Sequence, residues 1–254
     1  MSWNDLFVNM DNTNFFNFSF LPKYGSAFVR GFEYTLLLAV VSVLLAVIPA
    51  LLLAMMRLSK IKPIKWFAGA YIAVFRSTPM LVQLSIIYFG LFHYISLPRT
   101  LLFGFIAINR FIPGVVALAL NSSAYVAEIF RAGILAVDKG QTEAARSLGL
   151  SEGQTMRKII LPQAVRNILP ALGNEFIMML KETSLASTFF LGDIMTSYLI
   201  VKGATFLTLE PLTIVAAIYL CVTYPLSKLV DKFGKKMSNP NSYRNRKVKA
   251  GGKV

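Results

Sequence analysis

The sequence predicts an all-α integral membrane protein with about five transmembrane helices, and composition and charge placement carry that prediction. Hydrophobic residues make up 56% of the 254 positions and the mean hydropathy is +0.60, which is too apolar for a soluble domain of this size. Of the 26 lysines and arginines, 20 fall in residues 57–65, 131–181 and 228–253. The apolar stretches place these three segments on one side of a membrane, which the positive-inside rule makes cytoplasmic. The net charge of +14 therefore needs no nucleic-acid partner.

The first predicted span covers residues 35–56 and follows an N-terminal segment on the outer side. Its 22 residues are enough to cross a hydrocarbon core of about 30 Å at about 1.5 Å per residue. Residues 1–34 lack the basic region and cleavage site of a signal peptide, and we expect residues 1–30 to form an extracellular segment. Its phenylalanines favour an interfacial position, and a disordered tail is the alternative. These residues are Phe15, Phe16, Phe18 and Phe20.

The second apolar stretch, residues 66–97, is too long for one straight span perpendicular to the membrane. It is interrupted by Arg76-Ser77-Thr78-Pro79. Thr78 as an N-cap and Pro79 at the first helical position predict a helix that restarts at Pro79 and runs to about Tyr94. Whether residues 66–75 span the membrane or lie along its surface stays open.

Three further spans are predicted in residues 113–130, 160–181 and 212–230. With the N-terminus outside, five spans place the C-terminus in the cytoplasm. Residues 97–110 and 204–211 are expected to be extracellular connections, although the apolar residues at 101–108 and 195–201 leave a sixth span open.

The membrane domain is therefore expected to cover residues 31–234, including a loop at residues 138–162. Residues 235–254 are rich in Lys, Arg, Asn and Gly and have no apolar periodicity. We expect them to form a basic, disordered cytoplasmic tail close to anionic lipid.

The loop at residues 138–162 carries the signals of two short helices joined by a tight turn. Asp138 can cap a helix over residues 141–148, and Gly149 supplies the left-handed backbone that ends it. Ser151 followed three residues later by Gln154 is a capping-box pattern that begins a second helix. Leu161-Pro162 is expected to stop that helix, because a residue before proline disfavours the helical region.

The side chains of this loop predict a docking surface. Ala144 and Ala145 are expected to leave a flat patch into which a partner can press. Charged residues surround that patch: Glu143, Arg146, Arg157 and Lys158. A small amphipathic hairpin lying on the membrane would explain the alanines and the caps, but not the spacing that continues to Ile159 and Pro162.

The complete spacing resembles the cytoplasmic EAA loop of ABC importer permeases. It consists of Glu143-Ala144-Ala145, Gly149, Ile159 and Leu161-Pro162. The resemblance implies the type I permease fold and a helix-turn-helix through which the membrane subunit docks on a separate ATPase. ATP and Mg would then bind to that partner, and no cofactor to this chain.

Three other segments are similar to the polar amino-acid branch of these permeases. They are residues 75–84 (FRSTPMLVQL), 124–133 (AYVAEIFRAG) and 180–185 (LKETSL). The resemblance implies uptake of a polar amino acid across a prokaryotic plasma membrane. It also implies three kinds of partner: two copies of the ATPase, a second permease as homodimer or heterodimer, and an extracellular substrate-binding protein.

Polar residues within the spans are candidates for the substrate pathway. Asn121 and Glu128 lie seven residues apart and share one helical stripe, and Asn174 is followed by Glu175. An ionised carboxylate at membrane depth costs about 2.5 to 3.5 kcal/mol on insertion scales, so Glu175 should face a partner, a cavity or a substrate. Glu175 is expected to receive the ammonium of an amino acid. The half-helix that begins at Thr78-Pro79 is expected to receive its carboxylate.

Alternatives to these assignments are structural roles and other classes of protein. Glu128 lies three residues before Arg131 and could brace a helix instead of touching substrate. The chain lacks a Gly-x-x-x-x-Gly-Lys-Ser/Thr segment, so it is not itself the ATPase. His93 is the only histidine, which gives no support to a hydrolase or a metal site. A passive channel, a membrane assembly factor and an ABC permease for another small solute remain as alternative functions.

Overall fold

The computed structural model describes residues 17–102 and 104–238, and these residues are almost entirely helical. The helices are α1 (Leu21–Leu58), α2 (Lys62–Ser77), α3 (Met80–Ile86), α4 (Ile108–Leu135), α5 (Lys139–Ser147), α6 (Glu152–Thr155), α7 (Leu161–Glu182), α8 (Ile194–Thr205) and α9 (Leu209–Ser238). Two π-helical segments, η3 (Ile87–Leu91) and η4 (Met156–Ile160), and one 3-10 segment, η5 (Thr183–Phe189), extend them. Strands β1 (Leu101–Leu102) and β2 (Ile106–Ala107) form a small antiparallel hairpin.

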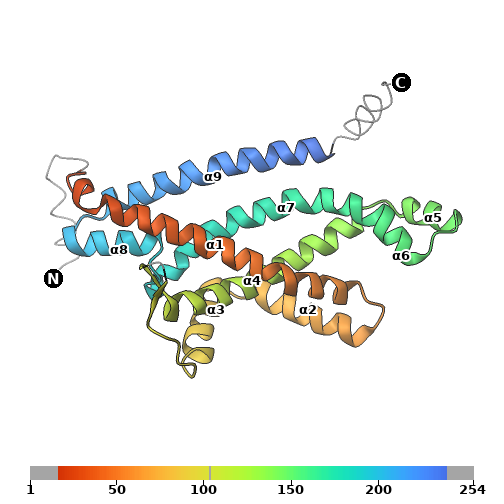
Figure 1. Cartoon of the computed structure of the whole chain (residues 1–254), viewed down its shortest axis with the longest axis horizontal. Coiled ribbons are helices and arrows are strands. Elements are labelled where there is room, and N and C mark those ends of the chain that lie inside the picture. The colour runs from red at the N-terminus through yellow and green to blue at the C-terminus, as the bar shows by residue number, and fades with distance from the viewer. Residues whose placement is uncertain (1–16, 103, 239–254) are drawn as a thin grey trace, which may run out of the picture.

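The long helices run nearly parallel in an elongated bundle (Figure 1). Three of them, α1, α4 and α9, are long and apolar enough to cross a membrane, and two bent helix pairs raise the number to five if each counts as one span. The prediction of about five spans is therefore confirmed. α1 contains the predicted span 35–56 but has 38 residues, a length of about 57 Å at about 1.5 Å per residue. Because a hydrocarbon core is about 30 Å thick, α1 extends beyond it.

The core of the bundle lies where α1 and α4 pack along each other (Figure 1). Leu38 of α1, Leu118 of α4 and Leu180 of α7 are fully buried there. Where α1 contacts α8, Gly31 approaches that helix so closely that an added Cβ would lie 2.3 Å from Ser197 Oγ and 2.9 Å from Ile194 Cα. Only glycine allows the two backbones this approach.

The second apolar stretch is broken as predicted, but the details of the break differ. α2 and the α3–η3 pair meet at 109°. Thr78 is not an N-cap, because its Oγ1 donates to the Val74 carbonyl 2.8 Å away in the preceding helix. Pro79 has extended backbone and itself precedes the first helical residue, Met80. The restarted helix ends at Leu91, not near Tyr94, because it widens into the π-helical segment η3 and passes into turns.

α2 packs against the side of the bundle through one face. Ala68 and Ile72 are buried, and they lie in one cluster with Ala50 of α1 and Ala124 of α4. Small residues at these contacts let three helices approach one another, as helices in membranes commonly do.

The prediction that Leu161-Pro162 stops a helix is wrong. Leu161 has helical backbone angles (φ −59°, ψ −42°), and the chain runs as one helical segment from Glu152 to Phe189. The preference of pre-proline residues is a bias that tertiary packing can override. Here Ile160 and Ala164 are buried on either side of Pro162, and the π-helical segment η4 lies just before it, so the helix passes the proline through a local change of its hydrogen-bond pattern.

The connections and the tail also differ in part from the predictions. Residues 195–201 belong to α8, which continues the α7–η5 segment across a bend of 44° and so forms part of a bent span, not a sixth one. Residues 235–238 are helical, so the predicted disordered tail does not begin at Lys235. Phe20 is buried in a cluster with Phe28, whereas Phe18 is exposed. Phe15, Phe16 and residues 239–254 lie outside the described residues.

Candidate functional site: a coupling hairpin and a charged groove

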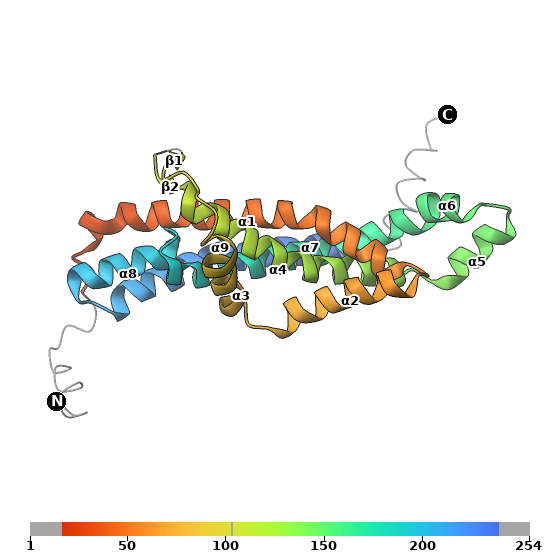
Figure 2. The same cartoon turned by 90° about the horizontal axis from the view of Figure 1, so that it is seen from below.

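The α5–α6 hairpin projects from one end of the bundle, and Figure 2 shows it beyond the ends of the long helices. Asp138 caps α5 by accepting from the Gly140 backbone N–H at 2.7 Å, and Gly149 has a φ of +82°. Ser151 and Gln154 form the full capping box at the start of α6. These three local predictions are confirmed. The cap, the glycine and the capping box each stabilise one part of a tight αα-turn.

The exposed face of the hairpin is not the alanine patch that the sequence predicted. Ala144 is exposed, but Ala145 is buried, with 5% of its surface accessible, because its carbonyl accepts from the Leu150 N–H and the turn folds over it. The most prominent apolar side chain is instead Leu148, which is 82% exposed beside Gly149. Glu143 is exposed on the same short helix. A partner would meet a protruding leucine with small and charged neighbours.

The remaining residues of the EAA pattern lie where the hairpin joins the bundle. Ile159 is half-buried in η4, and Leu161 and Pro162 are exposed at the start of α7. Their helical segment is continuous with α7. A force applied to the hairpin would therefore reach the bundle through a stiff element.

A groove of about 520 Å³ lies between α2, α4 and α7. Its polar lining comes from five side chains: Arg76, Tyr125, Glu128, Asn167 and Glu175. A second hollow of about 460 Å³ shares Arg76, Tyr125 and Glu128 and continues toward Arg57 and Ser77. Concave sites with a few convergent polar groups are the common form of small-molecule sites.

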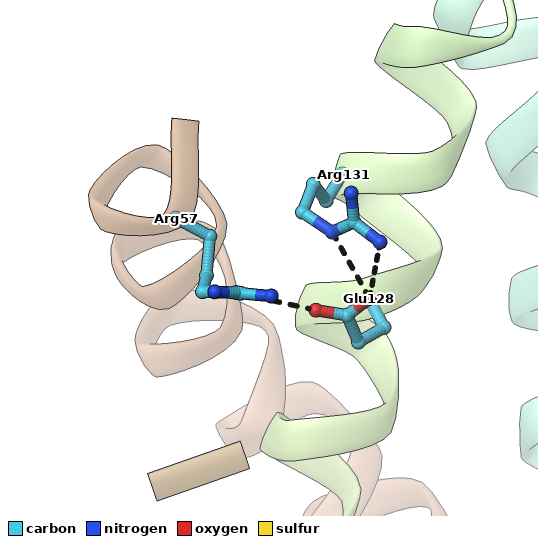
Figure 3. A network of polar contacts seen from close by, with 3 residues as sticks. All are labelled: Arg57, Glu128 and Arg131. Atoms are coloured by element: carbon cyan, nitrogen blue, oxygen red, sulfur yellow. Dashed lines mark hydrogen bonds and ion pairs between the residues drawn. The ribbon is translucent and has the colours of Figure 1, made fainter. Parts of the chain in front are cut away.

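Glu128 is committed to a network of arginines, shown in Figure 3. Its Oε2 accepts from Arg131 Nε at 3.0 Å and from Arg131 Nη2 at 2.7 Å. Its Oε1 lies 3.6 Å from Nε of Arg57, which comes from the last turn of α1. The bracing role that the sequence left open for Glu128 is thus present, and its side chain also forms part of the groove wall.

Arg76 and Glu175 are the two charged groups of the groove without an ion-pair partner within 4 Å in the described part of the chain. The Arg76 guanidinium lies over the Tyr125 ring, 5.2 Å from its centroid, in a cation–π contact. Glu175 is buried, with 7% of its surface accessible, and Oε1 accepts from the Ser122 hydroxyl at 2.9 Å. One cation and one anion therefore face the same hollow.

The other predicted pathway residues lie outside the groove lining. Thr78, Pro79 and Asn121 come together at the break between α2 and α3, where Asn121 donates to Gln83 Oε1 at 2.8 Å. Asn174 is exposed and does not line the groove. Since residues 78–81 do not line it either, the positive group in the groove is Arg76 and not the start of a half-helix.

Three residues of this region were missed as candidates: Arg76, Gln83 and Ser122. Arg76 and Gln83 lie in the segment that resembles the amino-acid branch, which was the available signal for both. Ser122 has no such signal, because its pairing with Glu175 joins residues 53 positions apart.

Comparison with known proteins identifies the family of the chain. A family model described as a binding-protein-dependent transport system inner membrane component matches residues 42–239. The chain belongs to this family. The arginine transport system permease protein ArtQ of Bacillus subtilis is 44% identical to this permease over 191 residues, 75% of this chain and 83% of that protein. The octopine transport system permease protein OccM of Rhizobium radiobacter is 38% identical over 214 residues, 84% of this chain and 87% of that protein.

Solved structures agree with the family. A chain from a crystal structure of an amino acid ABC transporter with histidines matches the permease with a TM-score of 0.79 and 47% identity, covering 87% of this chain and 98% of that chain. A chain of the inward-facing MetNI methionine ABC transporter has a TM-score of 0.69 at 18% identity, over 84% of this chain and 97% of that chain, and shows the shared fold. The predicted ABC importer permease fold is confirmed.

Proposed function

We propose that this permease is the membrane subunit of an ABC importer that carries a polar amino acid into the cytoplasm. The observation that carries the proposal is the placement of Arg76 and Glu175 in one groove, each without an ion-pair partner in the described residues. A zwitterionic amino acid presents one carboxylate and one ammonium. Arg76 is suited to the carboxylate because a guanidinium offers a fixed fork of donors. Glu175 is suited to the ammonium.

This pair would recognise the charges that all α-amino acids share, not one particular side chain. Similar proteins are named for transport of arginine, glutamine and octopine, which have an α-carboxylate and different side chains. Selection among side chains then belongs to the rest of the groove and to the binding protein that delivers the substrate. Asn167 and Tyr125, the uncharged polar residues of the lining, are available for that selection.

The hairpin would couple the groove to ATP hydrolysis on a separate ATPase. Coupling would use Glu143, Ala144, Leu148 and Gly149 at the turn, with Ala145, Ile159, Leu161 and Pro162 holding its shape. Because α6, η4 and α7 form one helical segment, displacement of the hairpin would move the groove wall that carries Glu175. ATP and Mg would stay on the ATPase.

The assembly we propose contains two ATPase copies, two permease subunits, an extracellular binding protein and surrounding lipid. Exposed apolar surface supports pairing and lipid contact, since only 6% of the most apolar stretch of α9 is buried against the rest of the chain. In the proposed orientation the N-terminal segment is outside. The hairpin and the end of α9, at the other end of the bundle, are in the cytoplasm, in agreement with the basic residues there.

ATP-dependent uptake tests the proposal. Vesicles containing the permease and its ATPase, with binding protein on the outside, should accumulate a labelled polar amino acid against its gradient only when ATP is enclosed. Entry that needs no ATP and stops when the inside and outside concentrations are equal would favour the passive channel. ATP-driven uptake that unlabelled amino acids fail to compete would instead point to a permease for another small solute.

A further inference from the structure

Gln83, on α3, is a buried polar residue that has no part in the groove or the hairpin. Its side chain is only 7% exposed. The amide nitrogen Nε2 lies 2.8 Å from the Phe75 carbonyl oxygen, 3.0 Å from the Thr78 carbonyl oxygen and 2.7 Å from Thr78 Oγ1. The amide oxygen Oε1 accepts from Asn121 Nδ2 at 2.8 Å. One side chain thus joins the end of α2, the start of α3 and the middle of α4.

The backbone around the break explains why an amide is needed there. The last carbonyls of a helix have no partner within the helix, and burying such groups unpaired costs about 1 to 3 kcal/mol each. Because α3 leaves at 109°, it cannot continue the hydrogen bonds of α2. Gln83 turns back and donates to two of these carbonyls, Phe75 and Thr78. Asn121 lies 3.4 Å from the same Phe75 oxygen and adds a weaker contact.

This set of bonds brackets Arg76 in the chain. Arg76 lies between Phe75 and Thr78, the two residues whose carbonyls Gln83 holds. Its guanidinium lies over the ring of Tyr125, one helical turn after Asn121 on α4. The hydrogen bond between the side-chain amides of Gln83 and Asn121 therefore links two elements. One is the backbone that carries the Arg76 guanidinium, and the other is α4, which carries the Tyr125 ring.

We propose that Gln83 is a positioning residue for substrate recognition: it holds the end of α2 against α4 so that the Arg76 guanidinium faces the groove and meets the substrate carboxylate. The inference rests on the proposed function, because it assigns Gln83 an effect on the carboxylate site of the same groove. Gln83 itself does not touch the substrate, since it does not line the groove.

The variant Gln83→Met removes the amide and keeps the length and flexibility of the side chain. The Thr78 carbonyl then loses the amide donor and the Phe75 carbonyl keeps only the weaker contact with Asn121, so the last turn of α2 is free to rotate Arg76 away from Tyr125. The loss should fall on ligands with an α-carboxylate and should spare ligands without one. A general loss of structure would weaken both kinds of ligand equally.

Equilibrium binding to the purified permease–ATPase complex, without binding protein, separates these effects. The probes are L-arginine and agmatine, which is the same molecule without its carboxylate. In the wild-type complex, arginine should bind more tightly than agmatine by about tenfold or more, because one charge-assisted hydrogen bond to the carboxylate contributes an affinity of this size. Gln83→Met should bring the ratio of arginine affinity to agmatine affinity close to the ratio in Arg76→Gln. The affinity for agmatine itself should change little. Ser85→Ala, a half-buried position on α3 whose hydroxyl donates to the Leu81 carbonyl of its own helix, should keep the wild-type ratio of arginine to agmatine affinity.

Each other outcome overturns a defined part of the account. If Arg76→Gln keeps the wild-type ratio, the groove assignment itself fails. If Arg76→Gln loses the ratio and Gln83→Met keeps it, the groove stands and the role of Gln83 is wrong. Should Gln83→Met not assemble, Asn121→Ala replaces it, because it removes the donor to Gln83 Oε1 and should reduce the ratio in the same direction. An unchanged ratio in an assembled Asn121→Ala complex would contradict the inference.

Discussion

Arg57 at the end of α1 and Glu128 on α4 face each other with Nε and Oε1 3.6 Å apart, and neither atom has a hydrogen-bond partner in the described structure. The other oxygen of Glu128 is bound by Arg131 at 2.7 and 3.0 Å. The Glu128 carboxylate is therefore bound by hydrogen bonds within its own helix, α4, whereas its contact with α1 is an ion pair without a hydrogen bond (Figure 3). This asymmetry predicts that the two arginines differ in their contribution to stability.

Removing Arg131 should destabilise the permease more than removing Arg57. Arg131→Met leaves a partly buried carboxylate with only the longer contact, which should cost about 2 to 3 kcal/mol, whereas Arg57→Met should cost about 1 kcal/mol or less. Thermal unfolding in detergent measures the difference. In Arg131→Met, the further change Glu128→Gln should restore part of the loss, because it removes the unpaired charge. Equal effects of the two arginine variants would contradict this account of the network.

The hairpin turn can be tested with two glycines that both leave room for an added Cβ but differ in their backbone conformation. No atom lies within 4 Å of a Cβ added to Gly149 or to Gly153, but only Gly149 has a positive φ, of +82°. Gly149→Ala should cost about 1 to 2 kcal/mol of local stability and weaken association with the ATPase, while Gly153→Ala should not. Co-purification of the ATPase with each permease variant measures the effect. Normal association and uptake in Gly149→Ala would argue against docking through this turn.

The contact between α1 and α8 gives a second pair of matched glycines. A Cβ at Gly31 would lie 2.3 Å from Ser197 Oγ, whereas a Cβ at Gly25 meets nothing within 4 Å. Gly31→Ala should therefore push α8 from α1 and destabilise the protein by about 1 to 3 kcal/mol, and Gly25→Ala should leave stability unchanged or raised. Melting temperatures of the two variants in detergent test this contact. A neutral Gly31→Ala would show that α8 can move aside at little cost.

Local signals were enough to predict most of the helices, and long-range contacts account for what was missed. Ser151 and Gln154 lie three residues apart, and their capping box follows from that spacing alone. The burial of Ala145 depends on how the turn folds over it, which the EAA pattern does not contain. Glu175 was identified by the cost of burying a charge, but its partner Ser122 lies on another helix. The proline signal at residue 79 placed the helix start within one residue, whereas the one at residue 162 gave a wrong helix end because packing overrode a local preference.

Orientation can be measured by thiol labelling in intact cells. In a Cys221→Ser background, Ser59→Cys and Ser151→Cys should react only with reagents that cross the membrane, because both positions lie at the end of the bundle assigned to the cytoplasm. Phe206→Cys should react with impermeant reagents, since Phe206 is 90% exposed in the connection at the opposite end. Labelling of Ser151→Cys from outside would overturn the topology and the docking of the hairpin with it.

The charge of Glu175 provides the most direct test of the central claim, that the groove binds the substrate. Glu175→Gln keeps the shape and the bond to Ser122 and removes only the charge that would pair with an ammonium. Glu182→Gln is the matched control, because Glu182 lies on the same helix outside the groove.

Uptake should be measured against substrate concentration in reconstituted vesicles, together with complex yield and basal ATP hydrolysis. The account predicts that Glu175→Gln raises the concentration for half-maximal uptake by about tenfold or more at normal yield and normal basal hydrolysis. Glu182→Gln should leave that concentration unchanged. An unchanged half-maximal concentration in Glu175→Gln, with normal yield, would contradict the assignment of the groove as the substrate site.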